Sequence, residues 1–346
     1  MNNDLLITTT VALMATGKGL LAIDESTGTC NKRFAAAGIP ETAEKRRDWR
    51  ELIVTTPFLN EGISGVILYD ETIRQATKAG IPMVNVITDE GIIPGIKVDT
   101  GAKPMAGFPG EKITSGLDGL AERLQEYAAL GARFCKWRGV FTIGNDLPTD
   151  ACVDANAHAL ARYAALCQQA GMVPVVEPEV LMAGSHDLQR CAGVTEAVLR
   201  AVFIQLYRHR ILPGGMILKP NMVTSGLQCD HPATVAEVAD ATINCLLRSV
   251  PAAVGGIAFL SGGQPGALAS AHLNAMHVNC KDRMPWPLTF SFGRAIQQPG
   301  LDSWQGSDSN TVKAQQALYH RVSCDRAALL GVYNEERERS TLLHPV

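Results

Sequence analysis

A lysine stands where an apolar strand should end. The stretch GGMILKPNMVTSG (214–226) carries Lys219 directly after the apolar run MIL and directly before a proline. An amine with the ordinary lysine pKa of about 10.4 is almost fully protonated at neutral pH and cannot attack a carbonyl. Apolar surroundings and a neighbouring cation both favour the uncharged amine, which can then form a Schiff base with a ketone or aldehyde. The position therefore predicts that Lys219 is a nucleophile.

Charged and hydroxyl side chains recur at or near the ends of other apolar runs. Parallel strands that are buried on both faces are usually apolar, and a buried charge is costly unless it is paired. Side chains two residues apart share a face, so Lys136 and Arg138 point the same way, as do Glu177 and Glu179. A shared polar site explains the set better than stability does. Its members are Asp24, Lys97, Lys136, Arg138, Glu177, Glu179, Lys219, Ser261 and Arg294.

The acidic and basic members of this set have complementary chemistry. We expect Lys136 to be the cation beside Lys219. Loss of water from a carbinolamine requires proton carriers, a task suited to Glu177 and Asp24. The resulting iminium accepts electrons when an adjacent carbon–carbon bond breaks, so a β-hydroxy ketone is the expected substrate. The candidate catalytic residues are Lys219, Glu177, Asp24, Lys136 and Glu179.

Two groups of residues are suited to bind phosphate. SGG (261–263) and SFGR (291–294) combine Arg294 with glycines, whose backbone N–H groups can approach an anion closely. Across the mouth, DESTGTCNKR (24–33) supplies Ser26, Thr29, Lys32 and Arg33, which Lys97 and Arg138 can join. Two anion sites in one cavity predict a sugar bisphosphate, or the product pair derived from it.

Short apolar runs separated by helical segments must position these residues. Strands separated by helices pair in parallel, and eight such units predict a closed (β/α)8 barrel, an α/β fold whose strands meet at one mouth. An open doubly wound sheet is the alternative, and MVNVIT (83–88) also fits a ninth strand. The eight runs are LLAID (20–24), VILYD (66–70), GIKVD (95–99), FCKWR (134–138), VPVVEPE (173–179), MILKP (216–220), GIAFLSGG (256–263) and LTFSFG (288–293).

Apolar residues three or four positions apart indicate the helices between these runs. Two helices are expected around 117–127 and 160–167, with Gly131 and Gly171 as their C-terminal stops. No repeat or low-complexity linker divides the chain, so we expect a single barrel domain over 1–346, with a C-terminal helical segment and tail from about 305. Further helices are expected at 42–53, 187–210, 234–249, 269–279 and 309–332.

The composition is that of a globular protein: 46% of the 346 residues are hydrophobic, 19% are charged, and the net charge is −3. The sequence contains no long run of Lys or Arg that would indicate binding to nucleic acid or anionic membranes. Nine cysteines without a CxxC pair indicate reduced thiols. The N-terminal stretch MNNDLLITTTVALMATGKG lacks a basic start and the apolar length of a membrane span. We therefore expect a cytoplasmic protein.

The histidines show none of the spacings typical of zinc enzymes. None of the eight forms an HxxxH or HExxH pattern, which disfavours a zinc-dependent reaction. His272 and His277 are interpreted as residues on a helix surface. We expect a reaction without a metal or another cofactor.

The quoted motifs together resemble the class I fructose-bisphosphate aldolase family. Matching stretches run in order from residue 17 to residue 295: GKGLLAIDESTGT, GIKVDTG, KWR, LARYAALCQQAG, VPVVEPEVL, LKPNMVTSG, FLSGGQ and LTFSFGRA. The resemblance implies reversible cleavage of fructose 1,6-bisphosphate into dihydroxyacetone phosphate and glyceraldehyde 3-phosphate. It also implies a homotetramer. A Schiff-base aldolase for sedoheptulose 1,7-bisphosphate is an alternative, and a non-catalytic scaffold is disfavoured because the catalytic candidates are all present.

The resemblance also implies roles for individual residues. Lys219 forms the Schiff base, Glu177 is the general acid and base, Asp24 polarises the substrate, and Lys136 stabilises the charge change. The 1-phosphate is held by Ser261, Gly262, Gly263, Ser291, Gly293 and Arg294, and the 6-phosphate end is faced by Ser26, Thr29, Arg33, Lys97 and Arg138.

The sequence departs from the family's pattern at two places. The family usually has serine where Thr29 stands, which keeps the hydroxyl group. Animal members end in a tail whose terminal tyrosine helps to protonate the enamine, whereas this sequence ends in TLLHPV. Its late tyrosines, Tyr319 and Tyr333, are both expected to be helical.

Overall fold

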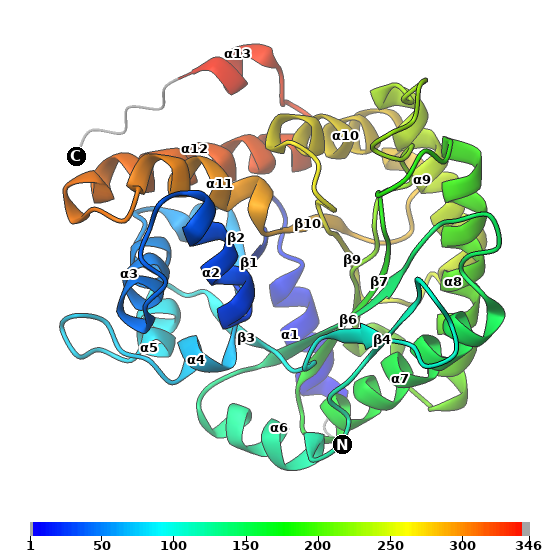
Figure 1. The fold of residues 1–346 in the computed structure, drawn as a ribbon, viewed down its shortest axis with the longest axis horizontal. Helices are drawn as coiled ribbons and strands as arrows, with labels where there is room; N and C mark the ends of the chain where they lie inside the picture. The colour runs from blue at the N-terminus through cyan, green and yellow to red at the C-terminus, as the bar shows by residue number, and fades with distance from the viewer. Residues whose placement is uncertain (1–2, 341–346) are drawn as a thin grey trace.

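The strands form a closed parallel barrel in the computed structural model, which describes residues 3–340 (Figure 1). Around the barrel the order is β1 (Gly19–Ala22), β10 (Leu288–Phe292), β9 (Ile257–Phe259), β8 (Ile217–Leu218), β7 (Val173–Val180), β6 (Phe134–Phe141), β3 (Ile93–Lys97) and β2 (Ile63–Leu68). β1 pairs with β10 through Leu20 and Ser291, and with β2 through Leu21 and Val66, which closes the sheet. Each predicted run overlaps a strand, so the barrel is confirmed and the open-sheet alternative is wrong.

Helices surround the barrel and connect its strands (Figure 1). The expected helices are all present, and Gly131 and Gly171 adopt positive φ after two of them, as a C-terminal stop requires. The ring contains α2 (Thr27–Ala36), α3 (Ala43–Val54), α4 (Asp70–Ile73), α5 (Met83–Asp89), α6 (Leu120–Ala129), α7 (Asp150–Gln169), α8 (Leu188–Arg208), α9 (Val235–Ser249), α10 (Gly266–Asn279), α11 (Arg294–Trp304) and α12 (Thr311–Leu329).

The proposed ninth strand is wrong, because residues 83–88 lie in α5. Met83, Val84 and Ile87 are buried there. Their spacing matches one face of a helix, and the run begins directly after Pro82, which suits a helix start. The structure also contains elements that were not expected, namely α2, α11 and a two-stranded antiparallel hairpin formed by β4 (Ala102–Pro104) and β5 (Lys112–Thr114).

The N-terminal helix α1 (Asn3–Leu13) closes the end of the barrel opposite the strands' carboxyl ends. Leu6 and Leu13 are fully buried and belong to one apolar cluster with Leu20 and Phe134 from the strands. Figure 1 shows α1 in the middle of the helical ring. A Cβ atom on Gly95 would come within 2.4 Å of the Phe134 ring, so a glycine is required where this ring fills the barrel. The barrel therefore has one open mouth.

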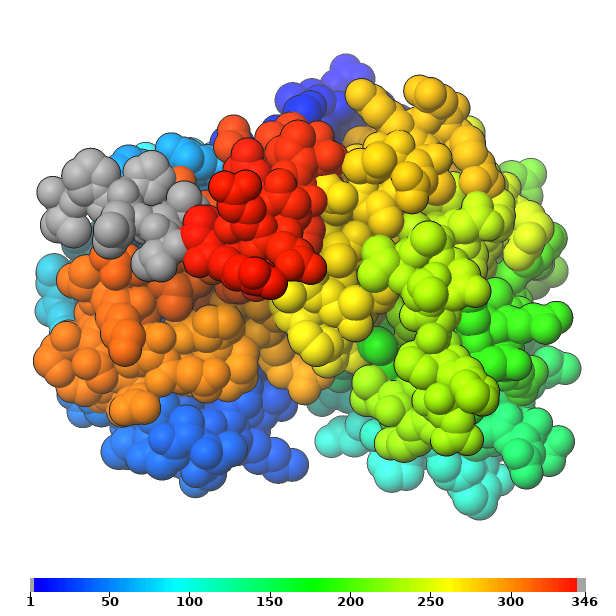
Figure 2. All heavy atoms as spheres, turned by 90° about the horizontal axis from the view of Figure 1, so that it is seen from above, coloured from blue at the N-terminus to red at the C-terminus, as the bar shows by residue number. Residues whose placement is uncertain are grey.

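The C-terminal segment packs on the outside of the ring. Trp49 of α3 stacks on Trp304 of α11 at a centroid distance of 5.4 Å. The last helix, α13 (Glu335–Arg339), follows α12, and Figure 2 shows the red C-terminal residues between the orange α11–α12 region and the yellow α10 region. Tyr319 is helical as expected, but Tyr333 lies in the turn before α13, so that expectation is wrong. The TLLHPV stretch lies outside the described residues, and the single-domain assignment stays a prediction.

Candidate active site

A cavity of about 680 Å³ lies at the mouth of the barrel, where the carboxyl ends of the strands meet. Every residue predicted for the site lines it: Asp24, Ser26, Thr29, Arg33, Lys97, Lys136, Arg138, Glu177, Glu179, Lys219, Ser261, Gly262, Gly263, Ser291, Gly293 and Arg294. Lys32 lines it too. The residues that the sequence analysis missed include Glu25, Asp99 and Lys112. Glu25 directly follows Asp24, and Asp99 lies two residues after Lys97, which was the only available signal.

Four charged side chains form a continuous chain of contacts, which we call the amine–carboxylate cluster. Lys219 Nζ lies 3.1 Å from Glu177 Oε1, and Glu177 Oε2 lies 3.0 Å from Lys136 Nζ. Lys136 Nζ in turn donates a hydrogen bond of 2.7 Å to Asp24 Oδ2. Only 3% of Lys219 is exposed. The sequence predicted two neighbouring amines; in the structure, one carboxylate contacts both of them.

The strand register brings the cluster together. Arg138 of β6 is paired with Glu177 of β7, and Val176 of β7 is paired with Leu218 of β8. The backbone N–H of Lys219 donates to the Val176 carbonyl at 2.8 Å, which extends β8 by one residue toward the mouth. Neighbouring strands therefore place Glu177 and Lys219 at one level of the barrel, and Lys136, which is paired with Val175, lies two residues farther from the mouth. Asp24 arrives from β1, on the other side of the barrel, and completes the cluster.

The charges in the cluster stabilise one another against burial. Burial disfavours the charge of Asp24, but Lys136 and Lys219 outweigh it and hold the pKa of Asp24 below its usual range. Burial likewise disfavours the charge of Glu177, yet these amines and Arg138 lower its pKa. Burial also opposes the charge of Lys136, but Asp24 and Glu177 raise its pKa. The two acids are thus ionised at neutral pH.

One end of the cavity is made of glycine-rich loops, and we call it the glycine-rich end: Ser261, Gly262, Gly263, Ser291, Gly293 and Arg294. Gly262 and Gly263 have φ values of 61° and 99°, which favour glycine. Gly293 precedes the first turn of α11, a helix start without a side-chain cap. Ser291 Oγ is buried without a hydrogen-bond partner, and the guanidinium of Arg294 makes no hydrogen bond or ion pair within residues 3–340. Unused donors therefore gather here, as an anion site requires.

The opposite end, which we call the ion-paired end, contains Ser26, Thr29, Arg33, Lys97 and Arg138. Each of its three cations already contacts a carboxylate. Arg33 contacts Glu25 at 2.6 Å, Lys97 contacts Asp99 at 2.9 Å, and Arg138 contacts Glu179 at 2.9 Å. Ser26 Oγ lies 3.1 Å from Thr29 Oγ1, and it caps α2. An anion at this end must therefore compete with acids of the protein itself.

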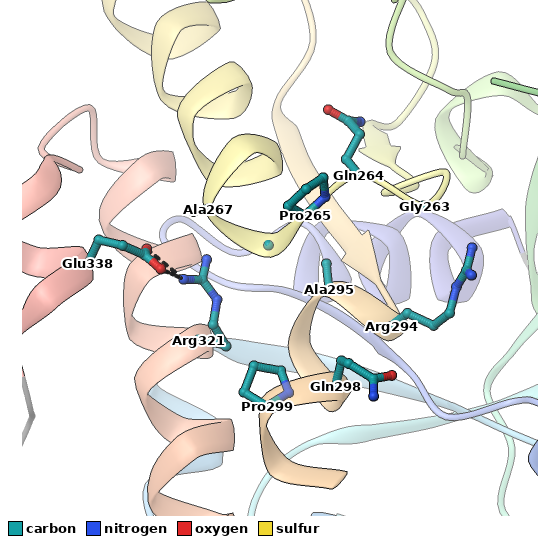
Figure 3. A pocket seen from close by; sticks show the side chains of 11 residues that line it. Gly263, Gln264, Pro265, Ala267, Arg294, Ala295, Gln298, Pro299, Arg321 and Glu338 are labelled. Atoms are coloured by element: carbon teal, nitrogen blue, oxygen red, sulfur yellow. Dashed lines mark hydrogen bonds and ion pairs between the residues drawn. The ribbon is translucent and has the colours of Figure 1, made fainter. Parts of the chain in front are cut away.

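A second cavity, of about 420 Å³, lies beside the first and shares Gly263 and Arg294 with it (Figure 3). Figure 3 shows Arg321 pointing into this cavity and Arg294 pointing away from it. Both Glu338 oxygens accept hydrogen bonds of 2.6 Å from Arg321, which fixes α13 against α12. This cavity contains no amine with the surroundings of Lys219. The chemistry therefore belongs to the larger cavity.

His272 is not the surface residue that was expected, whereas His277 is partly exposed. His272 is 3% exposed, and its Nδ1 lies 2.6 Å from Gln264 Oε1. Burial lowers the pKa of each to about 4, so both rings are neutral. His272 lies on the face of α10 that packs against the core. Apolar residues are spread around the whole helix in AHLNAMHVN, so the sequence did not show which face is buried. In the part of the chain that the structure describes, no three His, Cys, Asp or Glu residues are grouped to hold a metal ion.

A closed barrel with a buried lysine in contact with a carboxylate, at a mouth suited to anions, defines a (β/α)8 enzyme of the lysine-dependent type. The chain belongs to the class I fructose-bisphosphate aldolase family. The family model described as "Glycolytic: Fructose-bisphosphate aldolase class-I" matches residues 5–344. The resemblance seen in the sequence is therefore confirmed.

Individual relatives agree over nearly the whole chain. A "Probable fructose-bisphosphate aldolase class 1" from Xanthomonas campestris is 54% identical over 332 residues, 96% of this chain and 99% of the relative. "Fructose-bisphosphate aldolase 4, cytosolic" from Arabidopsis thaliana is 47% identical, over 93% of this chain and 82% of the relative. The solved structure of Plasmodium falciparum fructose-bisphosphate aldolase, in complex with TRAP and an inhibitor, superimposes with a TM-score of 0.93 at 46% identity. It covers 96% of this chain and 95% of the other.

Proposed function

We propose that this protein cleaves fructose 1,6-bisphosphate reversibly into dihydroxyacetone phosphate and glyceraldehyde 3-phosphate, through a Schiff base on Lys219. The contact of Lys219 with Glu177 carries the assignment, because it places a nucleophile and a proton acceptor 3.1 Å apart in a buried site. Membership in the aldolase family supports this substrate. The relatives described above bear the fructose-bisphosphate name, which does not favour sedoheptulose 1,7-bisphosphate as the main substrate.

The cluster can free the amine without changing its net charge. Attack on the C2 carbonyl requires that Lys219 lose a proton, and Glu177 Oε1 is the acceptor in contact with it. After this transfer, Lys136 and Asp24 still form an ion pair at 2.7 Å. Glu177 is then a carboxylic acid that can protonate the departing hydroxyl group of the carbinolamine. The former carbonyl oxygen has already taken one proton from the attacking nitrogen, so with the proton of Glu177 it leaves as water, and the nitrogen lone pair forms the iminium double bond.

The same groups can support cleavage of the C3–C4 bond. The bonding electrons flow toward the iminium and produce an enamine, while a carboxylate accepts the C4 hydroxyl proton and the aldehyde carbonyl forms. Glu177 suits this second transfer, because it is ionised again once the hydroxyl group has left as water. Asp24 stays ionised beside Lys136 and can polarise the C4 hydroxyl group. Protonation of the enamine at C3 and hydrolysis of the iminium then release dihydroxyacetone phosphate and Lys219.

The two ends of the cavity suit the two phosphates. The glycine-rich end offers free donors to the 1-phosphate of the half that stays attached to Lys219, and the ion-paired end offers Arg33, Lys97 and Arg138 to the 6-phosphate. The role of Glu179 follows from its contact with Arg138, which it orients toward the cavity. The iminium supplies the electron sink, so we propose that no metal takes part. A cleavage assay with and without a chelator checks this, because loss of activity on chelation would contradict it.

Trapping the intermediate tests the main assignment. Borohydride reduction in the presence of dihydroxyacetone phosphate is expected to label Lys219, located by peptide mass spectrometry. The Lys219→Met protein should give no label, and the Lys281→Met protein should label normally, because Lys281 is exposed and far from the mouth. A label on another lysine, or none in the wild-type protein, would reject the proposal.

Assembly and location also remain proposals. The family resemblance suggests a homotetramer, which native mass spectrometry would detect as a species of four times the monomer mass. Cytosolic names among the Arabidopsis relatives support a cytoplasmic location. No helix within residues 3–340 combines the length and the apolar character needed to cross a membrane.

A further inference from the structure

Glu25 lies at the ion-paired end and is shared between two arginines. Its Oε1 accepts a hydrogen bond of 2.6 Å from Arg33 and one of 2.8 Å from Gln297. Its Oε2 lies 3.0 Å from Arg50 NH1. Arg33 and Glu25 line the cavity, whereas Arg50 lies behind them and is only 2% exposed. One carboxylate thus neutralises part of the charge of two cations, of which only one can reach a ligand.

The contact with Arg50 is incomplete. Glu25 Oε2 and the Nε and NH1 groups of Arg50 are all buried without a hydrogen bond within residues 3–340. Buried donors and acceptors that lack partners are unfavourable, and a charge-assisted hydrogen bond between them is strong. A small shift of Glu25 toward Arg50 would turn the contact between Oε2 and NH1, now 3.0 Å, into a well-aligned hydrogen bond. It would also remove the carboxylate from Arg33 NH1, which would then keep only its hydrogen bond of 2.9 Å to Gln297 Oε1.

We propose that Glu25 is a resident anion that occupies Arg33 until the substrate's remote phosphate displaces it toward Arg50. The proposal rests on the function proposed above and adds a specificity residue to it. Phosphate and carboxylate compete for the same guanidinium, and the hydrogen bonds gained with Arg50 offset those lost with Arg33. Glu25 therefore sets how tightly the remote phosphate is held, and how readily the phosphorylated aldehyde leaves.

The substitution Glu25→Gln tests this exchange, because the neutral amide keeps the shape but competes poorly for Arg33. The KM for fructose 1,6-bisphosphate is expected to fall about tenfold, the size expected for one charge-assisted hydrogen bond. Product inhibition by glyceraldehyde 3-phosphate should strengthen by a similar factor. The KM for fructose 1-phosphate, which has a hydroxyl group at C6, should change less than about twofold. Glu122→Gln, at an exposed position of α6, is the matched control and should change neither substrate.

The substitution Arg50→Gln tests the receiving partner and predicts the opposite sign. Without Arg50, Glu25 stays on Arg33, so the KM for fructose 1,6-bisphosphate should rise while that for fructose 1-phosphate stays constant. Because Arg50 is buried, thermal unfolding must first show that this variant is folded; if it is not, the Glu25→Gln measurements decide alone. A purely structural role of Glu25 would change both substrates equally, or raise the KM for the bisphosphate, and either result would overturn the proposal.

The outcomes also separate this inference from the proposed function. If the wild-type protein neither cleaves fructose 1,6-bisphosphate nor is trapped by borohydride, the proposed function fails. If the wild-type protein does both but Glu25→Gln leaves the ratio of the two KM values unchanged, only the resident-anion proposal fails.

Discussion

The two ends of the cavity hold their cations differently. At the glycine-rich end the guanidinium of Arg294 has no partner within residues 3–340, and the loop beside it is fixed by the positive φ of Gly262 and Gly263. At the ion-paired end Arg33, Lys97 and Arg138 each contact an acid. An anion finds the first end preorganised, whereas at the second it must replace a carboxylate. In the proposed reaction, the first end holds the half bound to lysine and the second holds the half that leaves, so the difference suits retention at one end and release at the other.

Removing the amine between the ends has the largest expected effect. Lys219→Met should reduce kcat by roughly 10⁴-fold or more, because no other group can form the Schiff base. The affinity for the bisphosphate, measured by isothermal titration calorimetry, should stay within about tenfold of wild type, since both ends remain. Substantial cleavage activity in this variant would contradict the mechanism.

Changing the glycine-rich end comes next. Arg294→Ala should raise the KM for fructose 1,6-bisphosphate and for fructose 1-phosphate alike, by roughly 30-fold, because both carry the 1-phosphate. Steady-state kinetics with the two substrates provides the measurement. An effect confined to the bisphosphate would assign Arg294 to the 6-phosphate and would show that the glycine-rich end does not hold the 1-phosphate.

A smaller and more selective effect is expected at the ion-paired end. Arg138→Ala should raise the KM for the bisphosphate by about tenfold or less, because the wild-type arginine must first leave Glu179. The KM for fructose 1-phosphate should not change. Exposed Arg162→Ala on α7 is the control, with both KM values expected at wild-type level. Equal effects on the two substrates would show that the ends are not distinct.

The smallest effect concerns stability in acid. The pKa of Asp24 is lower in the folded protein than its usual value of 3.8, so its contribution to stability is present above about pH 4 and is lost as the pH falls further. Asp24→Asn should therefore reduce the loss of unfolding free energy between pH 5 and pH 3 by about 1 kcal/mol, measured by urea denaturation. An unchanged or steeper pH dependence would argue against the charge pairing in the amine–carboxylate cluster.

The sequence was sufficient to predict which residues meet at the mouth. Parallel strands end at one level, so polar residues that interrupt apolar runs, such as Lys136, Glu177 and Lys219, had to converge once the barrel was inferred. The same argument placed SGG and SFGR at one end of the cavity. Their roles in catalysis remain predictions.

Features that depend on distant partners could not be predicted. The hydrogen bonding of Arg33 depends on Gln297, which lies 264 residues later in the chain and contacts both Arg33 and Glu25. The local spacing of His272 fits a surface position as well as a buried one, and only the packing of α10 decides. The run at 83–88 has strand-like composition, but its apolar positions fit one face of a helix, and the helix is what the packing selects.

The position of α1 affects the order in which substrates bind and products leave. Because Leu6 and Leu13 fill one end with apolar side chains, the barrel is open at one end only. Substrates and products must therefore enter and leave through the same mouth. In the proposed reaction, the half bound covalently to Lys219 stays in the cavity while glyceraldehyde 3-phosphate leaves through the mouth. In the reverse condensation, dihydroxyacetone phosphate must therefore bind before glyceraldehyde 3-phosphate.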